Sequence, residues 1–192
     1  MTNEKLFIPL LLGTNRKDRK SIFAAQWVLN QMEKRDEINT VLFDPQNFNL
    51  PHDGYGTDIK DKFPDWRDAI IKADGLVIVT PEYNHGYPGV LKSILDLLLK
   101  EYIHKAVAFV GVSSKAWGGT RVIEAMLPTV RELGLTVTFS DLNFPFIEKK
   151  FNENGKLLDE EYEHRVKDFL DELVWMSRIL KWGRKNLPSK YH

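Results

Sequence analysis

The 192-residue sequence contains no cysteine. That absence excludes disulfides, thiolate nucleophiles and cysteine-ligated metals, and it fits a reducing compartment, so we expect a cytoplasmic protein. The 27 lysines and arginines are balanced by 27 aspartates and glutamates. No net charge therefore favours binding to nucleic acid or to an anionic membrane. No stretch approaches the roughly 20 apolar residues that span a bilayer, so we expect neither kind of partner.

What the chain does contain is the composition of a folded globular protein, with 43% hydrophobic and 28% charged residues. Its length fits one domain, for which we take residues 1–192. The apolar run Leu6–Leu12 follows Lys5 and leads to Gly13 and a basic cluster rather than to a small-residue cleavage site. We interpret this run as a first strand and not as a signal peptide.

The stretch from residue 75 to residue 89 is the most informative one. Residues 75–80 form an apolar, largely β-branched run, which predicts a strand of a parallel sheet that is buried on both faces. Pro81 ends the strand, polar residues 82–85 follow, and Pro88 suits the first turn of a helix. A buried strand, a polar turn and a buried helix form the arrangement with which open α/β sheets bind ligands at their carboxyl edge.

Further strands and helices alternate along the chain. Apolar runs predict strands at 6–12, 39–43, 106–112 and 135–139, and helical spacing predicts helices at 22–32, 63–73, 90–100, 122–133 and 159–183, followed by a frayed tail at 184–192. Together with the strand at 75–80 they predict an α/β fold, a doubly wound sheet of five parallel strands with helices on both faces. Pro9 is better tolerated at an edge or a bulge than inside a strand. The irregular segment 44–61 is long enough to indicate a functional loop.

The loop after the first strand predicts a phosphate site. It precedes a helix N-terminus, where free amide groups attract anions. Four of its side chains suit a phosphate: Thr14, Asn15, Arg16 and Ser21. The spacing fits neither a Walker loop nor a dinucleotide fingerprint, because the next glycine after Gly13 is Gly54. A solvated basic turn is the alternative.

Two more polar loops should lie at the same edge of the sheet: the second loop, residues 81–86, and the third loop, residues 113–119. In the second loop, Tyr83 and Tyr87 offer flat faces to a planar heterocycle, and Glu82 is a loop carboxylate rather than a general base. His85 is either an exposed turn residue or a contact for a reducing nucleotide. In the third loop, Trp117 either covers a ligand or packs in the core. The histidines lack metal-ligand spacing, so we expect no metal site.

Residues 80–84, Thr-Pro-Glu-Tyr-Asn, and residues 88–93, Pro-Gly-Val-Leu-Lys-Ser, closely resemble the signature of the NADPH-dependent FMN reductase family. The resemblance implies a flavodoxin-like sheet with strand order 2-1-3-4-5. It also implies FMN as the cofactor, with the phosphate on Thr14, Asn15, Arg16 and Ser21, the isoalloxazine beside Pro81, Glu82, Tyr83 and Asn84, and Ser113 and Ser114 near the ring.

The resemblance further implies hydride transfer from NADPH or NADH to FMN and then to a small-molecule acceptor such as a quinone, a flavin or an azo compound. The cofactor carries this chemistry, so we expect no catalytic side chain. Family members commonly form dimers or dimers of dimers, which implies a homodimer or homotetramer, with the helix after Gly89 as a candidate contact. A flavodoxin-like electron carrier and a non-enzymatic relative with a regulatory role remain alternatives; such carriers are usually acidic, whereas this chain is neutral.

Overall fold

The computed structural model describes residues 4–191. Its main sheet is parallel, with the strand order β4-β2-β5-β6-β7. In the order of the chain this is 2-1-3-4-5, so the predicted flavodoxin-like α/β fold is confirmed. The strands are β1 (Leu6–Phe7), β2 (Leu10–Leu12), β3 (Ile38–Asn39), β4 (Leu42–Phe43), β5 (Gly75–Pro81), β6 (Ala106–Val112), β7 (Thr136–Val137) and β8 (Leu142–Phe144).

The first predicted strand is broken at Pro9 into β1 and β2, although Pro9 lies neither at an edge nor at a bulge. β2 is an inner strand between β4 and β5. The proline lacks an N–H donor, but its carbonyl accepts from Val77 N–H at 3.0 Å, and Ile8 N–H donates to the Asn39 carbonyl at 2.9 Å. The backbone therefore keeps its direction and its neighbours through the break.

The fifth predicted strand, 135–139, is shorter than expected and has a second part. β7 pairs with the start of β6, the chain then leaves the sheet, and β8 returns to pair with Val110–Val112 in parallel. Phe139, predicted to end the strand, lies outside it and is 95% exposed. β8 was not predicted because Asn143, in its middle, and Pro145, just after it, interrupt the apolar pattern.

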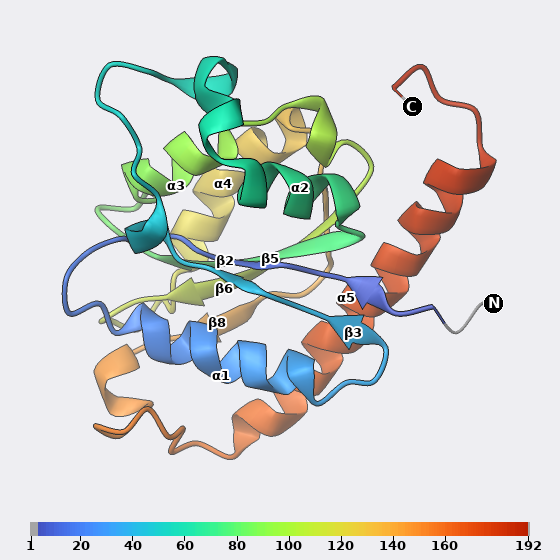
Figure 1. Ribbon diagram of the computed structural model, residues 1–192. Helices are drawn as coiled ribbons and strands as arrows, with labels where there is room; N and C mark the ends of the chain where they lie inside the picture. The colour runs from blue at the N-terminus through green and yellow to red at the C-terminus, as the bar shows by residue number, and fades with distance from the viewer. Residues whose placement is uncertain (1–3, 192) are drawn as a thin grey trace.

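Helices cover both faces of the sheet (Figure 1). They are α1 (Ser21–Glu33), α2 (Pro64–Lys72), α3 (Gly89–Leu95), α4 (Thr120–Glu132) and α5 (Glu161–Asn186), with 3₁₀ turns at Pro45–Asn47, Gly56–Lys62, Lys100–Tyr102 and Ile147–Lys149. β5 alternates between two cores. Val77 and Val79 pack with α1 and α5, whereas Leu76 and Ile78 pack with α2, α3 and α4. The two-residue period of a strand thus fills both layers.

Two helix ends differ from the prediction. α3 ends at Leu95 instead of residue 100. Leu97 and Leu98 are buried in the turn beyond the helix, so part of the apolar run at 90–100 that predicted a helix belongs to a buried turn. α5 continues through Gly183 to Asn186, which makes residues 184–186 helical rather than frayed. Pro188 then prevents further helix. His192, the last residue of the predicted tail, lies outside the described residues.

An ionic cluster fixes α5 to the amino end of β5. The Asp74 carboxylate, 7% exposed, accepts from Phe7 N–H at 3.1 Å, from Lys181 Nζ at 3.0 Å and from Arg184 Nη2 at 3.2 Å. Arg184 also donates to the His104 carbonyl at 2.6 Å. Burial makes such a charge dependent on its partners, so we expect this cluster to be a sensitive point of the fold.

Replacement of Asp74 by alanine should therefore destabilise the protein by about 3 kcal/mol, because two half-buried cations lose their counter-ion. Asp61, which pairs with Arg67 but is 80% exposed, provides the matched control. Asp61→Ala should lose less than about 1 kcal/mol. Urea unfolding of the two variants measures both values, and equal losses would contradict the assignment.

Lys105 is a second buried cation at this end of the sheet. It donates to the carbonyls of Ile70 and Ile71, at the C-terminus of α2. The pKa of Lys105 is lowered to about 8, mainly by burial and to a smaller extent by the nearby positive charge of Arg184. A neutral amine still has two N–H groups for the two carbonyls, so the deprotonated form fits the site.

Between pH 8 and pH 10.5 the folded chain should thus have lost a proton that the unfolded chain retains at Lys105. The unfolded state binds more protons in this window, so the contribution of Lys105 to stability rises with pH. Lys105→Met should flatten that rise in unfolding free energies measured at intervals across the window. A variant with the unchanged slope of the wild type would refute the assignment.

Candidate functional site

Three loops meet at the carboxyl edge of the sheet, as the sequence predicted. Thr14 Oγ1 and Tyr83 Oη are 3.0 Å apart, a hydrogen bond that joins the first loop to the second. Glu82 N–H donates to the Val112 carbonyl at 2.9 Å and joins the start of the second loop to the last residue of β6, from which the third loop leaves. Parallel strands make this convergence necessary, because their carboxyl ends share one edge.

The first loop presents an unsatisfied donor set at the start of α1. Thr14 is buried and its Oγ1 also accepts Arg16 N–H at 3.2 Å. Ser21 is the first residue of α1, and its buried Oγ has no hydrogen-bond partner within residues 4–191. None of the described side chains caps this N-terminus. A buried hydroxyl beside free helix amides is suited to an anion.

The polar residues of the first loop divide into two groups. Asn15 and Arg16 have exposed side chains, and Arg16 forms no ion pair among the described residues. Arg19, in contrast, is nearly buried, pairs with Asp44 and donates to the Arg16 carbonyl at 3.4 Å. The alternative of a merely solvated basic turn therefore does not hold for Arg19, which fixes the loop to the segment after β4.

The second loop makes a two-residue turn. The N–H and carbonyl groups of Tyr83 and Gly86 bond to each other at 2.9 and 3.0 Å, and φ is 50° at Asn84 and 66° at His85. Positive φ at both central residues is the type I′ geometry, which asparagine tolerates better than histidine does. Both side chains are exposed, so His85 is a turn residue on the surface.

Arg121 belongs to this edge and was not predicted. Its Nη2 lies 2.5 Å from Glu82 Oε1, and the Glu82 side chain is 5% exposed. Glu82 Oε2 and Arg121 Nε are buried without a partner among the described residues. The counter-ion of Glu82 thus comes from the first turn of α4.

Trp117 covers this ion pair from outside. The Arg121 guanidinium lies 5.3 Å from the centre of the indole ring, and Trp117 is 58% exposed. Core packing, one of the two interpretations of Trp117, is therefore wrong. Trp117 precedes α4 and is separated from it by Gly118 and Gly119, both at positive φ, so no helical spacing in the sequence indicated its contact with Arg121.

The third loop is tightly folded on β8. Ser113 Oγ donates to the Lys115 carbonyl at 2.7 Å, and Ser113 N–H donates to the Phe144 carbonyl at 3.1 Å. Gly119 has a φ of 85°, and a Cβ there would lie 2.5 Å from Val112 N, so only glycine fits. The Ser113 hydroxyl therefore shapes the loop, whereas Ser114 is exposed.

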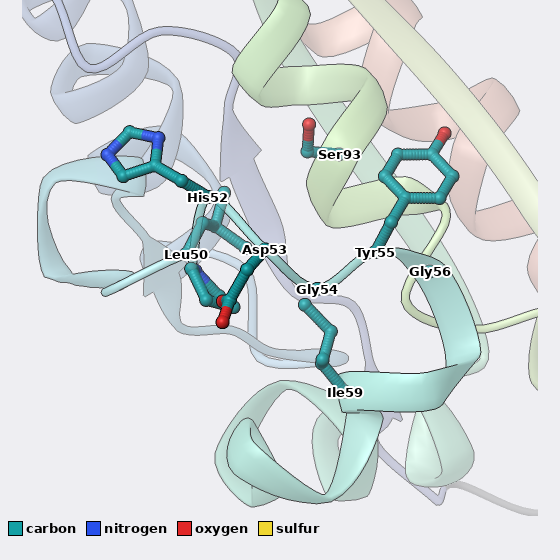
Figure 2. A pocket seen from close by; sticks show the side chains of 9 residues that line it. Leu50, His52, Asp53, Gly54, Tyr55, Gly56, Ile59 and Ser93 are labelled. Carbon is teal, nitrogen blue, oxygen red and sulfur yellow. The ribbon is translucent and has the colours of Figure 1, made fainter.

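A cavity of about 430 Å³ lies where the long segment after β4 faces α3 (Figure 2). Its lining comes from residues 50–56, Ile59 and Ser93. Tyr55 Oη donates to Asp96, which also pairs with Lys92 Nζ at 2.6 Å, and burial raises the pKa of Asp96. The segment expected to be functional thus encloses a hollow with polar walls.

Among residues 4–191, no three His, Asp or Glu residues come close enough together to hold a metal ion. No helix in this part of the chain is long and apolar enough to span a membrane.

Several proteins of similar sequence are named as reductases. The NADH:(hydroxy)cinnamate reductase subunit CrdA of Vibrio ruber is 23% identical over 88% of this chain and 86% of its own length. The FMN-dependent NADPH-azoreductase of Staphylococcus haemolyticus is 31% identical over 61% of this chain and 63% of its own length. Among solved structures, the flavoenzyme FerB, an NAD(P)H:(acceptor) oxidoreductase from Paracoccus denitrificans, superposes with a TM-score of 0.74 at 21% identity, over 90% of this chain and 97% of FerB.

The model of the NADPH-dependent FMN reductase family matches residues 8–149, the part of the chain that runs from the first strand through the third loop and β8. All three loops of the candidate site lie within this match. The chain belongs to the NADPH-dependent FMN reductase family.

Proposed function

We propose that this protein is an FMN-dependent NAD(P)H oxidoreductase that reduces a small-molecule acceptor. The observation that carries the proposal is the buried Ser21 hydroxyl, which lacks a partner among the described residues and lies at the uncapped start of α1. FMN, when bound, would accept hydride from NADPH or NADH and pass electrons to the acceptor. The protein needs no nucleophile of its own for this chemistry.

The first loop would hold the phosphate of FMN. Ser21 Oγ and the free amides of α1 supply neutral donors, and the Arg16 guanidinium supplies an unpaired positive charge. Thr14 shapes the loop, because its Oγ1 already bonds Arg16 N–H and Tyr83. Asn15 adds an exposed amide at the mouth of the loop.

The second and third loops would place the isoalloxazine ring. Pro81 ends β5 directly under this edge, and Tyr83 and Asn84 belong to a turn that two backbone hydrogen bonds hold rigid. The Glu82 and Arg121 pair fixes the turn to α4, so the ring would meet preorganised donors. Ser114 is the exposed hydroxyl of the third loop and would face the ring, while Ser113 supports it from below.

Several relatives take small acceptors, among them a 2-hydroxy-1,4-benzoquinone reductase from a Burkholderia species, 30% identical over 62% of this chain and 70% of its own length. By analogy we propose a quinone, azo compound or flavin as the acceptor here. We also propose that the chain forms one domain around its sheet, acts as a homo-oligomer and lies in the cytoplasm, the compartment that its lack of cysteine favours.

Purified protein mixed with FMN, NADPH or NADH and benzoquinone tests the activity. Oxidation of the nicotinamide that depends on both protein and FMN supports the reductase. Yellow protein that does not oxidise either nicotinamide would identify an electron carrier instead. Protein that cannot bind FMN would refute both and leave the regulatory alternative.

The phosphate assignment predicts a weaker affinity for FMN in two variants. Arg16→Ala should raise the Kd of FMN by about 10-fold to 100-fold, because a charge-assisted hydrogen bond contributes roughly 1.5–3 kcal/mol. Ser21→Ala should raise it by about 3-fold to 10-fold through the loss of a neutral donor. Quenching of FMN fluorescence measures each Kd.

Lys17→Ala is the matched control, since Lys17 is an exposed cation next to Arg16. It should change the Kd by less than about 3-fold at physiological salt. An Arg16→Ala variant that binds FMN as tightly as this control would show that the phosphate lies elsewhere.

The Glu82 and Arg121 pair predicts a coupled effect on folding and binding. Arg121→Met leaves the buried Glu82 carboxylate without its cation and should destabilise the apoprotein by about 2 kcal/mol, while also weakening FMN binding. Glu82→Gln in the same chain should recover most of the stability, because the remaining amide is neutral. Arg131→Met, on the exposed face of α4, should change neither quantity. Additive losses in the double variant would contradict the coupling.

A further inference from the structure

The second half of α5 has an exposed apolar stripe. Trp175, Ile179 and Trp182 occur at a spacing of four and three residues and are 56%, 43% and 58% exposed. Such spacing places them on one side of a helix. Figure 1 shows this part of α5 at the periphery of the molecule, and beside the stripe a groove of about 860 Å³ extends to Leu6. Two exposed tryptophans in one stripe indicate a binding surface.

Charge is divided along the same helix. Residues 159–172 contain seven Asp or Glu and two Lys or Arg, whereas residues 173–191 contain five Lys or Arg and no Asp or Glu. The helix is thus acidic before the stripe and basic through and after it. The overall neutrality of the chain conceals this separation.

The separation of acidic from basic residues along α5 decides which partner suits the stripe. A second copy lying parallel would bring acid against acid and base against base. An anionic membrane would attract the basic half but repel the carboxylates of the acidic half. A second copy lying antiparallel brings the half of each helix with net positive charge towards the half of the other with net negative charge, so the net long-range interaction is favourable.

We propose that two copies of this chain associate through an antiparallel, two-fold contact of their α5 helices, centred between Arg178 and Ile179. Trp175 and Trp182 lie at equal distances from that centre along the helix, so Trp175 of each copy packs at the level of Trp182 of the other. Glu172 comes to the level of residue 185, near the Lys185 charge of the second copy, whereas the level of Asp168 lies beyond Asn186, the last residue of that copy's helix. A contact of this kind is self-complementary, as two-fold symmetry requires.

The contact leaves the candidate site free. The basic half of α5 is fixed to Asp74 and to the His104 carbonyl, at the amino ends of β5 and β6. The three site loops lie at the carboxyl ends of the strands, on the opposite edge. This surface also differs from the helix after Gly89, the contact that the family resemblance suggested. The α5 contact therefore does not depend on the flavin chemistry.

The absence of native cysteine allows a direct test by crosslinking of the full-length protein. Ile179→Cys should form an intermolecular disulfide under mild oxidation, because the two copies of residue 179 lie next to the two-fold axis. Lys167→Cys is the control: residue 167 has a 67% exposed side chain, but its two copies would be about 35 Å apart at 1.5 Å per residue. Linkage at 179 and not at 167 is the expected result. No linkage at 179, or equal linkage at both positions, would overturn the proposal.

Sedimentation gives a second measurement. Trp182→Glu should halve the mass of the associated species, whereas Ile71→Glu, at a residue of α2 that is 55% exposed, should leave it unchanged. Both residues are on the surface, so thermal unfolding should show that both variants remain folded. A wild-type mass unaffected by Trp182→Glu would refute the contact. If Ile179→Cys does not crosslink and Trp182→Glu does not change the mass, but the wild-type protein co-sediments with phosphatidylglycerol vesicles, the stripe belongs to a membrane surface instead.

Discussion

The parallel register of β5 and β6 is the constraint on which the rest of the structure depends. Seven residue pairs run without a break from Gly75 and Ala106 to Pro81 and Val112, and Glu82 N–H adds one more bond to the Val112 carbonyl. Because the strands are parallel and in register, β5 and β6 end at the same level along the strand direction. The second and third loops therefore start side by side, and the first loop joins them through β2, the next strand in the sheet.

Some residues at this edge hold the loops in place, and others are available to bind a ligand. Thr14 Oγ1, Ser113 Oγ and the terminal nitrogens of Arg19 are engaged within the protein. Ser21, Arg16 and Ser114 keep their polar groups available, either buried without a partner among the described residues or exposed. Supporting atoms that are already held allow a molecule to bind with little rearrangement, although Arg19 Nε, Glu82 Oε2 and Arg121 Nε also lack a partner among the described residues.

The C-terminal helix serves the opposite edge. Its inner face packs on the sheet and its basic residues neutralise Asp74, so it holds the amino ends of the strands in place. Its outer face carries the tryptophan stripe at the periphery. The two edges of one sheet thus have separate roles, with ligand loops at one end and an anchored helix with a binding surface at the other.

Sequence alone was sufficient for the sheet, the helices that cover it and the loops that carry the candidate site. Long apolar runs such as 75–80 and 106–112 have few alternatives to a buried parallel strand, and the connections between parallel strands must place their loops at one edge. Weak patterns were misjudged for a physical reason. β8 is held by pairing with a distant strand and not by its own preferences, and helix α5 passes through Gly183 because neighbouring turns keep their contacts with the sheet.

Local sequence determined which residues lie in the loops, because turn and strand preferences depend on residues that are close in the sequence. Only the tertiary structure decided which of them meet. Arg121 reaches Glu82 from 39 positions away, Tyr83 reaches Thr14 from 69, and Trp117 stays outside while Ser21 is enclosed. These outcomes follow from the packing of whole elements, which fixes distances between residues that no local pattern connects.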